Sequence, residues 1–224
     1  MIELHNLTKS YPTPHGRKYV FKDLNFTLPS GSGVGLIGRN GAGKSTLLNL
    51  LAGLDSPDRG EVVTNERISW PVGLGSGFQG SLSARDNVRF VCRVFGATGP
   101  EKREKIEYVE SFAEIGNYFD LPMRTYSPGM RSRVAFGMSM AFDFDYYLID
   151  EVMAVGDPIF RKKAGAVFRE KLAGAGVILV SHNHKDIKDL CSTVVFIHNG
   201  HASVYDDVDE GLAAFQELLK ATQP

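Results

Sequence analysis

A glycine-rich segment near the amino terminus has the residue types and the spacing that phosphate binding needs. Residues 38–45 read GRNGAGKS and fit the pattern GxxxxGK[ST]. Glycines let backbone N–H groups turn inward around phosphate oxygens, and the start of a following helix adds partial positive charge. Lys44 is expected to reach the β- and γ-phosphates of a nucleotide, and the Ser45 hydroxyl to take a coordination position of Mg²⁺. The predicted nucleotide contacts are Gly38, Asn40, Gly41, Ala42, Gly43, Lys44, Ser45 and Thr46.

Two adjacent carboxylates form a second group of candidate residues. The apolar run at 146–149 ends in Asp150 and Glu151. Ligands of α/β sheets bind at the carboxyl ends of strands, so acids at this point favour a catalytic role over a structural one. Asp150 is predicted to hold Mg²⁺, and Glu151 is predicted to polarise the attacking water.

The segments around these residues alternate between strand and helix patterns. Short apolar runs at 34–37, 147–149, 177–180 and 194–197 are separated by helical stretches, which is typical of a parallel α/β sheet. The sequence also predicts strands at 2–7 and 19–28, a helix at 45–52, a turn at 57–60, a hairpin turn at Asn199-Gly200 and a helix at 211–219. These elements would place the glycine-rich loop and the two acids at the ends of strands.

The middle of the chain changes to helical patterns. Residues 83–86 fit a capping box, and 101–112 and 128–140 have helical character. We therefore expect one domain over 1–224, in which a helical lobe at about 82–134 is inserted between segments at about 1–81 and 135–224.

Composition excludes several classes of protein. The 224 residues contain 25 Lys and Arg against 26 Asp and Glu, so the formal charge is 25 − 26 = −1, which disfavours a nucleic-acid partner. No apolar stretch approaches the roughly 20 residues of a membrane span, and the amino terminus reads as a strand and not as a secretory signal. Cys92 and Cys191 lack the spacings of redox or zinc sites and are expected to be small buried residues.

Three further features complete a pattern that resembles the nucleotide-binding subunit of ATP-binding cassette (ABC) transporters. They are Gln79, the segment 126–130 that reads YSPGM, and His182. Ser127 lies 150 − 127 = 23 residues before Asp150, and His182 lies 182 − 151 = 31 residues after Glu151. The resemblance covers nearly the whole chain. It implies an α/β fold, a P-loop NTPase core with a mainly parallel sheet and an antiparallel β subdomain, and an inserted helical lobe.

The resemblance also implies roles for single residues. Tyr11 would stack on adenine, with Tyr19 as a second candidate. Gln79 would sense Mg²⁺ and the attacking water, and His182 would contact the γ-phosphate.

The signature loop of the family, usually LSGGQ, departs from its common form here. Pro128 replaces the first glycine, but Ser127 as N-cap and Pro128 as first helical residue still make a good helix start. By the resemblance, Ser127 and Gly129 would bind the ATP held by the opposite subunit of a head-to-tail dimer. The loop after the two acids keeps the family's Asp157, a further candidate contact to the nucleotide.

The segments 69–74, 77–82, 130–133 and 154–157 resemble the subset of this family that exports capsular polysaccharide. This implies an ATPase with ATP and Mg²⁺ as cofactors, peripheral on the cytoplasmic face of the bacterial inner membrane. Its partners would be a second copy, a polytopic permease and, through the permease, periplasmic and outer-membrane export components.

Other readings of the pattern stay open. Export of an O-antigen or teichoic-acid type of glycan is one alternative. A soluble non-transport ABC ATPase is disfavoured because the chain has no sustained heptads, a single phosphate loop and a charge of −1. A simple nucleotide kinase would have no use for the signature loop or His182.

Overall fold

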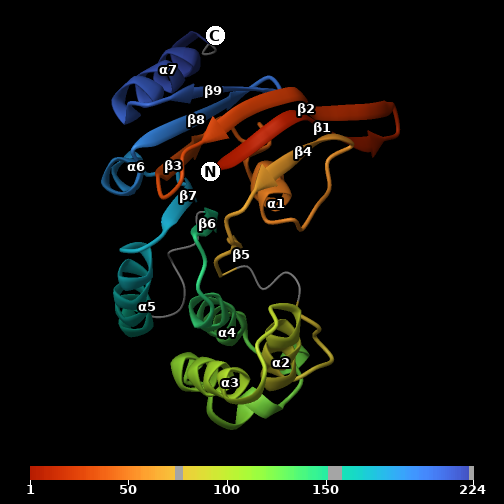
Figure 1. The fold of residues 1–224 in the computed structure, drawn as a ribbon, viewed down its shortest axis with the longest axis vertical. Helices are drawn as coiled ribbons and strands as arrows, with labels where there is room; N and C mark the ends of the chain where they lie inside the picture. The colour runs from red at the N-terminus through yellow and green to blue at the C-terminus, as the bar shows by residue number, and fades with distance from the viewer. Residues whose placement is uncertain (74–77, 151–157, 222–224) are drawn as a thin grey trace. The chain divides into compact units, whose positions relative to one another are not determined.

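The computed structural model describes residues 1–73, 78–150 and 158–221, which form two compact units (Figure 1). The sheet unit comprises 1–71, 144–150 and 174–221, and the helical unit comprises the described residues of 72–143 and 158–173. The helical unit is wider than the lobe expected at 82–134, because it also holds the described residues of 72–81, residues 135–143 and α5 (Pro158–Leu172). The division of the chain as one domain with that lobe stays a prediction.

A mainly parallel sheet runs through the sheet unit in the order β5-β6-β7-β3-β8-β9. Only the β8–β9 pair among these neighbours is antiparallel within the residues that the structure describes. The apolar runs are confirmed as strands, and β7 is buried along its whole length, as expected for a parallel sheet with both faces covered. The strands are β3 (Gly33–Ile37), β5 (Ile68–Pro71), β6 (Tyr146–Asp150), β7 (Gly176–Val180), β8 (Thr193–His198) and β9 (His201–Tyr205).

The predicted hairpin turn is confirmed between β8 and β9. His198 pairs with His201 across the turn. Asn199 and Gly200 have φ angles of 49° and 80°, and positive φ at both central residues is what a tight two-residue hairpin requires.

An antiparallel sheet in the order β2-β1-β4 completes the β structure of the sheet unit. Its strands are β1 (Ile2–Thr13), β2 (Gly16–Leu28) and β4 (Arg59–Thr64). The turn expected at 57–60 is wrong at its second half, because Arg59 pairs with Thr8 of β1 and starts β4. In β2 the alternation breaks because Asp23 has a φ of 50°, which lets both Phe21 and Leu24 be buried.

Helices cover both sides of the parallel sheet (Figure 1). α1 (Lys44–Leu51) buries Leu47, Leu48, Leu50 and Leu51 in a core shared with both sheets. On the other side lie α6 (His184–Leu190) and α7 (Val208–Ala221). α6 approaches β3 closely because Gly35 has no side chain: a Cβ there would lie 2.7 Å from Ile187 Cγ2.

The helical unit is built from α2 (Ala84–Val94), α3 (Gly99–Ala113), α4 (Pro128–Ala141) and α5, with short 3₁₀ turns at Gly116–Asp120 and Met123–Thr125. The predicted capping of α2 is confirmed, since Ser83 Oγ accepts a hydrogen bond from Asp86 N at 3.1 Å. Phe112 stacks on Phe136 with ring centroids 5.7 Å apart and meets Phe160 edge-on at 5.3 Å. These rings join α3, α4 and α5 in one aromatic core.

Candidate nucleotide-binding site

A cavity of about 790 Å³ lies in the sheet unit. Its lining includes the loop after β3, Asp150 at the end of β6, residues of the β1–β2 hairpin and residues 198–200 of the β8–β9 turn. β3 and β6 run parallel with β7 between them, so their carboxyl ends meet at one edge of the sheet. The structure thereby brings the glycine-rich loop and Asp150 together, as the sequence predicts.

The loop backbone has the geometry of a phosphate cradle. Gly43 has a φ of 109°, and a Cβ there would lie 2.5 Å from Val20 Cγ1 and 2.7 Å from Phe21 Cζ. Gly43 is also the N-cap of α1 and provides no side-chain hydrogen bond. The N–H groups of the first turn of α1 therefore have no capping side chain, which suits an anion.

Cationic side chains gather at this loop. Lys44 Nζ donates hydrogen bonds to the carbonyl oxygens of Gly38 at 2.9 Å and Arg39 at 3.2 Å. Lys18 and Arg39 line the same cavity, beside the single carboxylate of Asp150 among the described lining residues. This balance of charge favours a polyanionic ligand such as a triphosphate.

Both candidate tyrosines line the cavity, and each is anchored differently. The Tyr11 hydroxyl donates to Asp55 Oδ2 at 2.9 Å. A hydrogen bond from Lys9 holds the pKa of the Asp55 carboxyl below its ordinary value, so this acceptor is ionised. The Tyr19 ring lies under the Lys22 ammonium, 4.4 Å from Nζ to the centroid. Both rings remain candidates for the adenine platform.

His182 borders a smaller cavity of about 70 Å³ beside the loop. Gly38, Lys44 and Phe215 also line it. His182 follows β7, which pairs with both β3 and β6, and this topology places it next to the loop.

The donor set fits Mg²⁺ in part. Ser45 and Asp150 line the same cavity and offer a hydroxyl and a carboxylate oxygen, the hard ligands that Mg²⁺ prefers. Among the described residues no cluster of three His, Cys, Asp or Glu side chains could hold a metal by itself. Such a site suits Mg²⁺ that is completed by phosphate oxygens and waters. Glu151 and Asp157 lie outside the described residues.

Gln79 lies in the helical unit, where Asn87 holds its backbone. The Gln79 N–H donates to Asn87 Oδ1 at 2.8 Å, and Asn87 Nδ2 donates to the Gln79 carbonyl at 3.2 Å. Asn87 is buried and also donates to the Ser83 carbonyl at 2.8 Å. Sequence reasoning missed Asn87; the available signal was an amide side chain directly before Val88 in the apolar pattern of α2.

The signature loop starts a helix as predicted. Ser127 caps α4, and its Oγ accepts a hydrogen bond from Met130 N at 3.2 Å. Gly129 stands in open space, since the nearest atom to a Cβ built there is Ser127 Oγ at 3.9 Å. The start of α4 is thus exposed, and a ligand can reach it from the surface of the helical unit.

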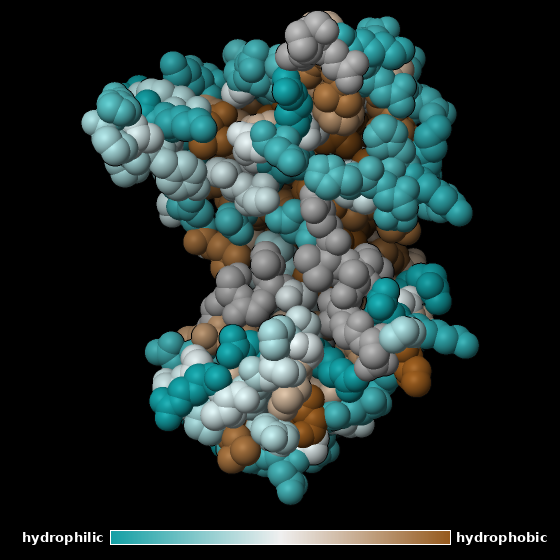
Figure 2. Space-filling view, turned by 180° about the vertical axis from the view of Figure 1, so that it is seen from behind, coloured by the Kyte–Doolittle hydropathy of each residue, from teal (hydrophilic) through white to brown (hydrophobic). Residues whose placement is uncertain are grey.

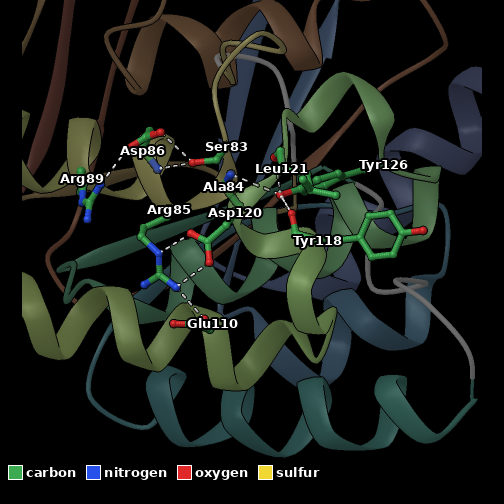
Figure 3. A network of polar contacts seen from close by, with 10 residues as sticks. All are labelled: Ser83, Ala84, Arg85, Asp86, Arg89, Glu110, Tyr118, Asp120, Leu121 and Tyr126. Atoms are coloured by element: carbon green, nitrogen blue, oxygen red, sulfur yellow. Dashed lines mark hydrogen bonds and ion pairs between the residues drawn. The ribbon is translucent and has the colours of Figure 1, made fainter.

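The residue before Ser127 anchors this loop to the N-terminus of α2 (Figure 3). The buried Tyr126 hydroxyl accepts from Ala84 N at 3.2 Å and donates to the Tyr118 carbonyl at 2.6 Å. Burial raises the pKa of the Tyr126 phenol, which keeps this proton in place. Nearby, Arg85 forms two hydrogen bonds to Asp120 at 2.6 and 3.1 Å.

Removing that hydroxyl should weaken the helical unit. We expect Tyr126→Phe to lower the free energy of unfolding in urea by about 1–3 kcal/mol, because the Ala84 N–H loses its partner in a buried place. The matched control is Tyr118→Phe, whose exposed hydroxyl points away from the network in Figure 3 and whose loss should change stability by less than about 0.5 kcal/mol. Equal losses in the two variants would contradict the anchoring role.

Comparisons with known proteins bear on the identity of the site. The family model "ABC transporter" matches residues 21–154. The polysialic acid transport ATP-binding protein KpsT of Escherichia coli is 53% identical and aligns over 96% of this chain and 96% of its own length. The capsule polysaccharide export ATP-binding protein CtrD of Neisseria meningitidis serogroup B is 40% identical over 97% of this chain and 100% of its own.

A solved structure supports the fold. The ATP-binding cassette MJ0796, a dimer in a post-hydrolysis state bound to ADP and Pi, aligns with a TM-score of 0.71 and covers 92% of this chain and 98% of its own. Its sequence identity is 22%, so the likeness concerns the fold alone. Because the family model matches more than half of the chain and both relatives match nearly all of it, the chain belongs to the ABC transporter family, as one of its ATP-binding cassette ATPases.

Proposed function

We propose that this chain is the ATP-hydrolysing subunit of a bacterial ABC transporter that exports a capsular polysaccharide across the inner membrane through a separate permease. The observation that carries the chemistry is the cavity that the loop at 39–46 and Asp150 line together. The substrate class rests on the near full-length similarity to KpsT and CtrD, which are named for polysialic acid transport and capsule polysaccharide export.

In this proposal the triphosphate of ATP lies on the glycine-rich loop. The backbone N–H groups of Gly41 and Gly43 would bind its oxygens, and Asn40 and Thr46 line the same cavity. The Ala42 N–H donates to the Arg39 carbonyl at 3.0 Å, so Ala42 contributes by shaping the loop around the phosphate. When ATP binds, the Lys44 ammonium gives up its hydrogen bond to the Gly38 carbonyl and binds the β- and γ-phosphates. The adenine ring stacks on Tyr11 or Tyr19, which line the same cavity.

Mg²⁺ is the second cofactor that we assign to this site. When bound, it would neutralise charge on the β- and γ-phosphates. Ser45 and Asp150 supply protein oxygens for it, and Gln79 is the third proposed ligand. Gln79 belongs to the helical unit, so its backbone bonds to Asn87 fix only its local conformation.

Hydrolysis then needs a base and a group that stabilises the leaving charge. Glu151 follows Asp150 in the sequence and is assigned the proton of the attacking water. Gln79 orients that water, and His182 contacts the γ-phosphate beside Lys44, with which it shares a cavity lining. Positioned groups of this kind contribute on the order of 10²–10⁴-fold to a proton-transfer step.

A second copy of the chain is the partner that completes each site. Ser127 and Gly129 present an exposed helix start, and we assign them to the ATP on the opposite subunit of a head-to-tail dimer. Asp157 is assigned to the same closed interface. Two-fold symmetry makes the contact reciprocal, so ATP joins the two subunits.

A polytopic permease is the proposed membrane partner. None of the helices in the described parts of the chain is long and apolar enough to cross a membrane. Figure 2 shows hydrophobic residues at the surface of the helical unit, and α2 and its end expose Phe90, Val94 and Phe95 by 60%, 65% and 46%. We assign this surface and the segment around Gln79 to permease docking at the cytoplasmic face of the inner membrane. The permease would link the chain to periplasmic and outer-membrane export components, and no nucleic acid is assigned as a partner.

Nucleotide binding is tested by Lys44→Ala. We expect the affinity for ATP to fall roughly 10- to 100-fold, because a charge-assisted contact to phosphate is worth about 1.5–3 kcal/mol. Titration calorimetry measures this directly. Lys162→Ala removes the same charge from an exposed position on α5 and should leave the affinity unchanged. An unaltered ATP affinity in Lys44→Ala would overturn the assigned role of the loop.

The exported substrate is tested in a bacterium that lacks this gene. Wild-type chain should restore surface polysaccharide, whereas Lys44→Ala should leave the polymer trapped inside the cell. Chemical analysis of the trapped polymer then identifies its class. A trapped O-antigen or teichoic-acid glycan would overturn the capsule assignment while leaving the transport ATPase assignment intact.

A further inference from the structure

The two residues that flank His182 in the sequence are hydrogen-bonded to one carboxylate, that of Asp186. Ser181 Oγ donates to Asp186 Oδ2 at 3.3 Å, and Asn183 Nδ2 donates to Asp186 Oδ1 at 3.1 Å. The Asn183 N–H also donates to Ser181 Oγ at 3.0 Å, so the hydrogen bonds of Ser181, Asn183 and Asp186 form a closed ring. The residues on both sides of His182 are therefore hydrogen-bonded to the same acceptor group and to each other.

The carboxylate that closes this ring is held by a packed helix. Asp186 lies in the first turn of α6, and Asn183 caps that helix by accepting from Lys185 N at 3.1 Å. The next residue, Ile187, is fully buried and packs against β3 at Gly35. β3 leads directly into the glycine-rich loop. The same strand therefore positions both this ring of hydrogen bonds and the loop.

The position of the His182 ring bears on the nucleotide site because it lines the small cavity together with Gly38 and Lys44. A backbone rotation at 181–183 would move the imidazole relative to Lys44. Displacements of about 1 Å at a reacting group can cost on the order of 100-fold in rate.

We infer that Asp186 is a positioning residue for ATP hydrolysis, and that it acts by holding Ser181 and Asn183 so that His182 keeps its place beside the glycine-rich loop. This inference rests on the proposed role of His182 at the γ-phosphate. Asp186 acts through His182 and has no direct contact with nucleotide in the proposal.

Three variants of the full chain separate this role from a general effect of charge or helix stability. Asp186→Ala removes both acceptors and should lower kcat for ATP about tenfold, with KM changed less than twofold. Asp186→Asn loses the negative charge but keeps the shape and an acceptor for Asn183, so it should retain at least half of the wild-type kcat. Asp189→Ala removes the same carboxylate three residues further along α6, where it lies exposed, and should match wild type.

A double-mutant cycle gives the decisive readout. If Asp186 acts through His182, adding Asp186→Ala to His182→Ala should lower kcat by less than twofold further. Independent, multiplicative losses would overturn the inference and indicate a merely structural role. A wild-type kcat in Asp186→Ala, with a slow His182→Ala, would also overturn the inference and leave the proposed function standing. If His182→Ala itself turns over at the wild-type rate, the assigned role of His182 fails as well.

Nuclear magnetic resonance of the imidazole tests the same inference without turnover. The His182 signals, identified by their loss in His182→Ala, should shift or broaden in Asp186→Ala and stay unchanged in Asp189→Ala. Unchanged His182 signals in a folded Asp186→Ala chain would overturn the inference.

Discussion

Glu151→Gln should bind ATP with near wild-type affinity and lower its turnover by about 10²–10⁴-fold. Glutamine keeps the size and hydrogen-bonding capacity of the side chain, but it cannot take a proton from water at neutral pH. The expectation rests on the place of Glu151 directly after Asp150, which ends β6 at the lining of the nucleotide cavity. Steady-state phosphate release and titration of ATP binding on the same preparation measure the two effects separately.

The control for this experiment is a carboxylate of the same type at a distant place. Glu107→Gln changes an exposed side chain on α3 and should leave both ATP affinity and turnover unchanged. If Glu151→Gln hydrolysed ATP at a rate close to wild type, another group would be the base. If it failed to bind ATP at all, its loss of activity would say nothing about proton transfer and the prediction would be wrong.

The parts of the fold that sequence reasoning predicted are those decided by local chemistry. Ser83 and Ser127 cap α2 and α4 because their hydroxyls bond backbone N–H groups three residues ahead. Asn199 and Gly200 set the β8–β9 turn because both tolerate positive φ. The loop at 38–45 was predicted for the same reason, since its pattern lies within eight consecutive residues.

The parts that sequence reasoning missed depend on partners far along the chain. β4 exists because Arg59 to Thr64 pair with β1, and this pairing overrides the turn preference of residues 57–60. Asn87 is recognisable as the clamp on Gln79 only when both are seen together. Arg85 joins Glu110 and Asp120, which lie 25 and 35 residues away, and no spacing rule for one helix connects such positions.

The choice between Tyr11 and Tyr19 shows the same limit inside one hairpin. Tyr11 pairs with Lys18, and Tyr19 pairs with Ser10, so the two rings come from neighbouring rungs of the β1–β2 ladder. The register is regular across these two rungs, so the alternation of the strands alone would direct the two rings to opposite faces. Both rings nevertheless line the cavity, and a sequence pattern with period two cannot choose between them.

Ser127→Arg should leave ATP binding to the monomer nearly intact and abolish both dimer closure and turnover. Ser127 is exposed at the start of α4, so the larger cation can be accommodated in the free chain. In a closed head-to-tail dimer the same position would face the partner's ATP, where the bulky side chain would fill the space that the phosphate needs. Analytical ultracentrifugation with ATP, in a Glu151→Gln background that prevents its consumption, measures closure. Ser203→Arg adds the same charge on the exposed edge strand β9 and should not affect it.

Mixing two defective chains tests which subunit each residue serves. A heterodimer of Ser127→Arg with Lys44→Ala contains one site with both defects and one with neither, provided that Ser127 acts on the opposite chain's ATP. Neither variant alone should dimerise, but their mixture should, because one intact composite site remains. If Ser127 instead served the ATP of its own chain, every site in the mixture would carry one defect and no dimer would form. A photoreactive γ-phosphate analogue of ATP bound to the chain with intact Lys44 should correspondingly label residues 126–130 of the other chain. Labelling of the same chain's own signature loop would contradict the head-to-tail arrangement.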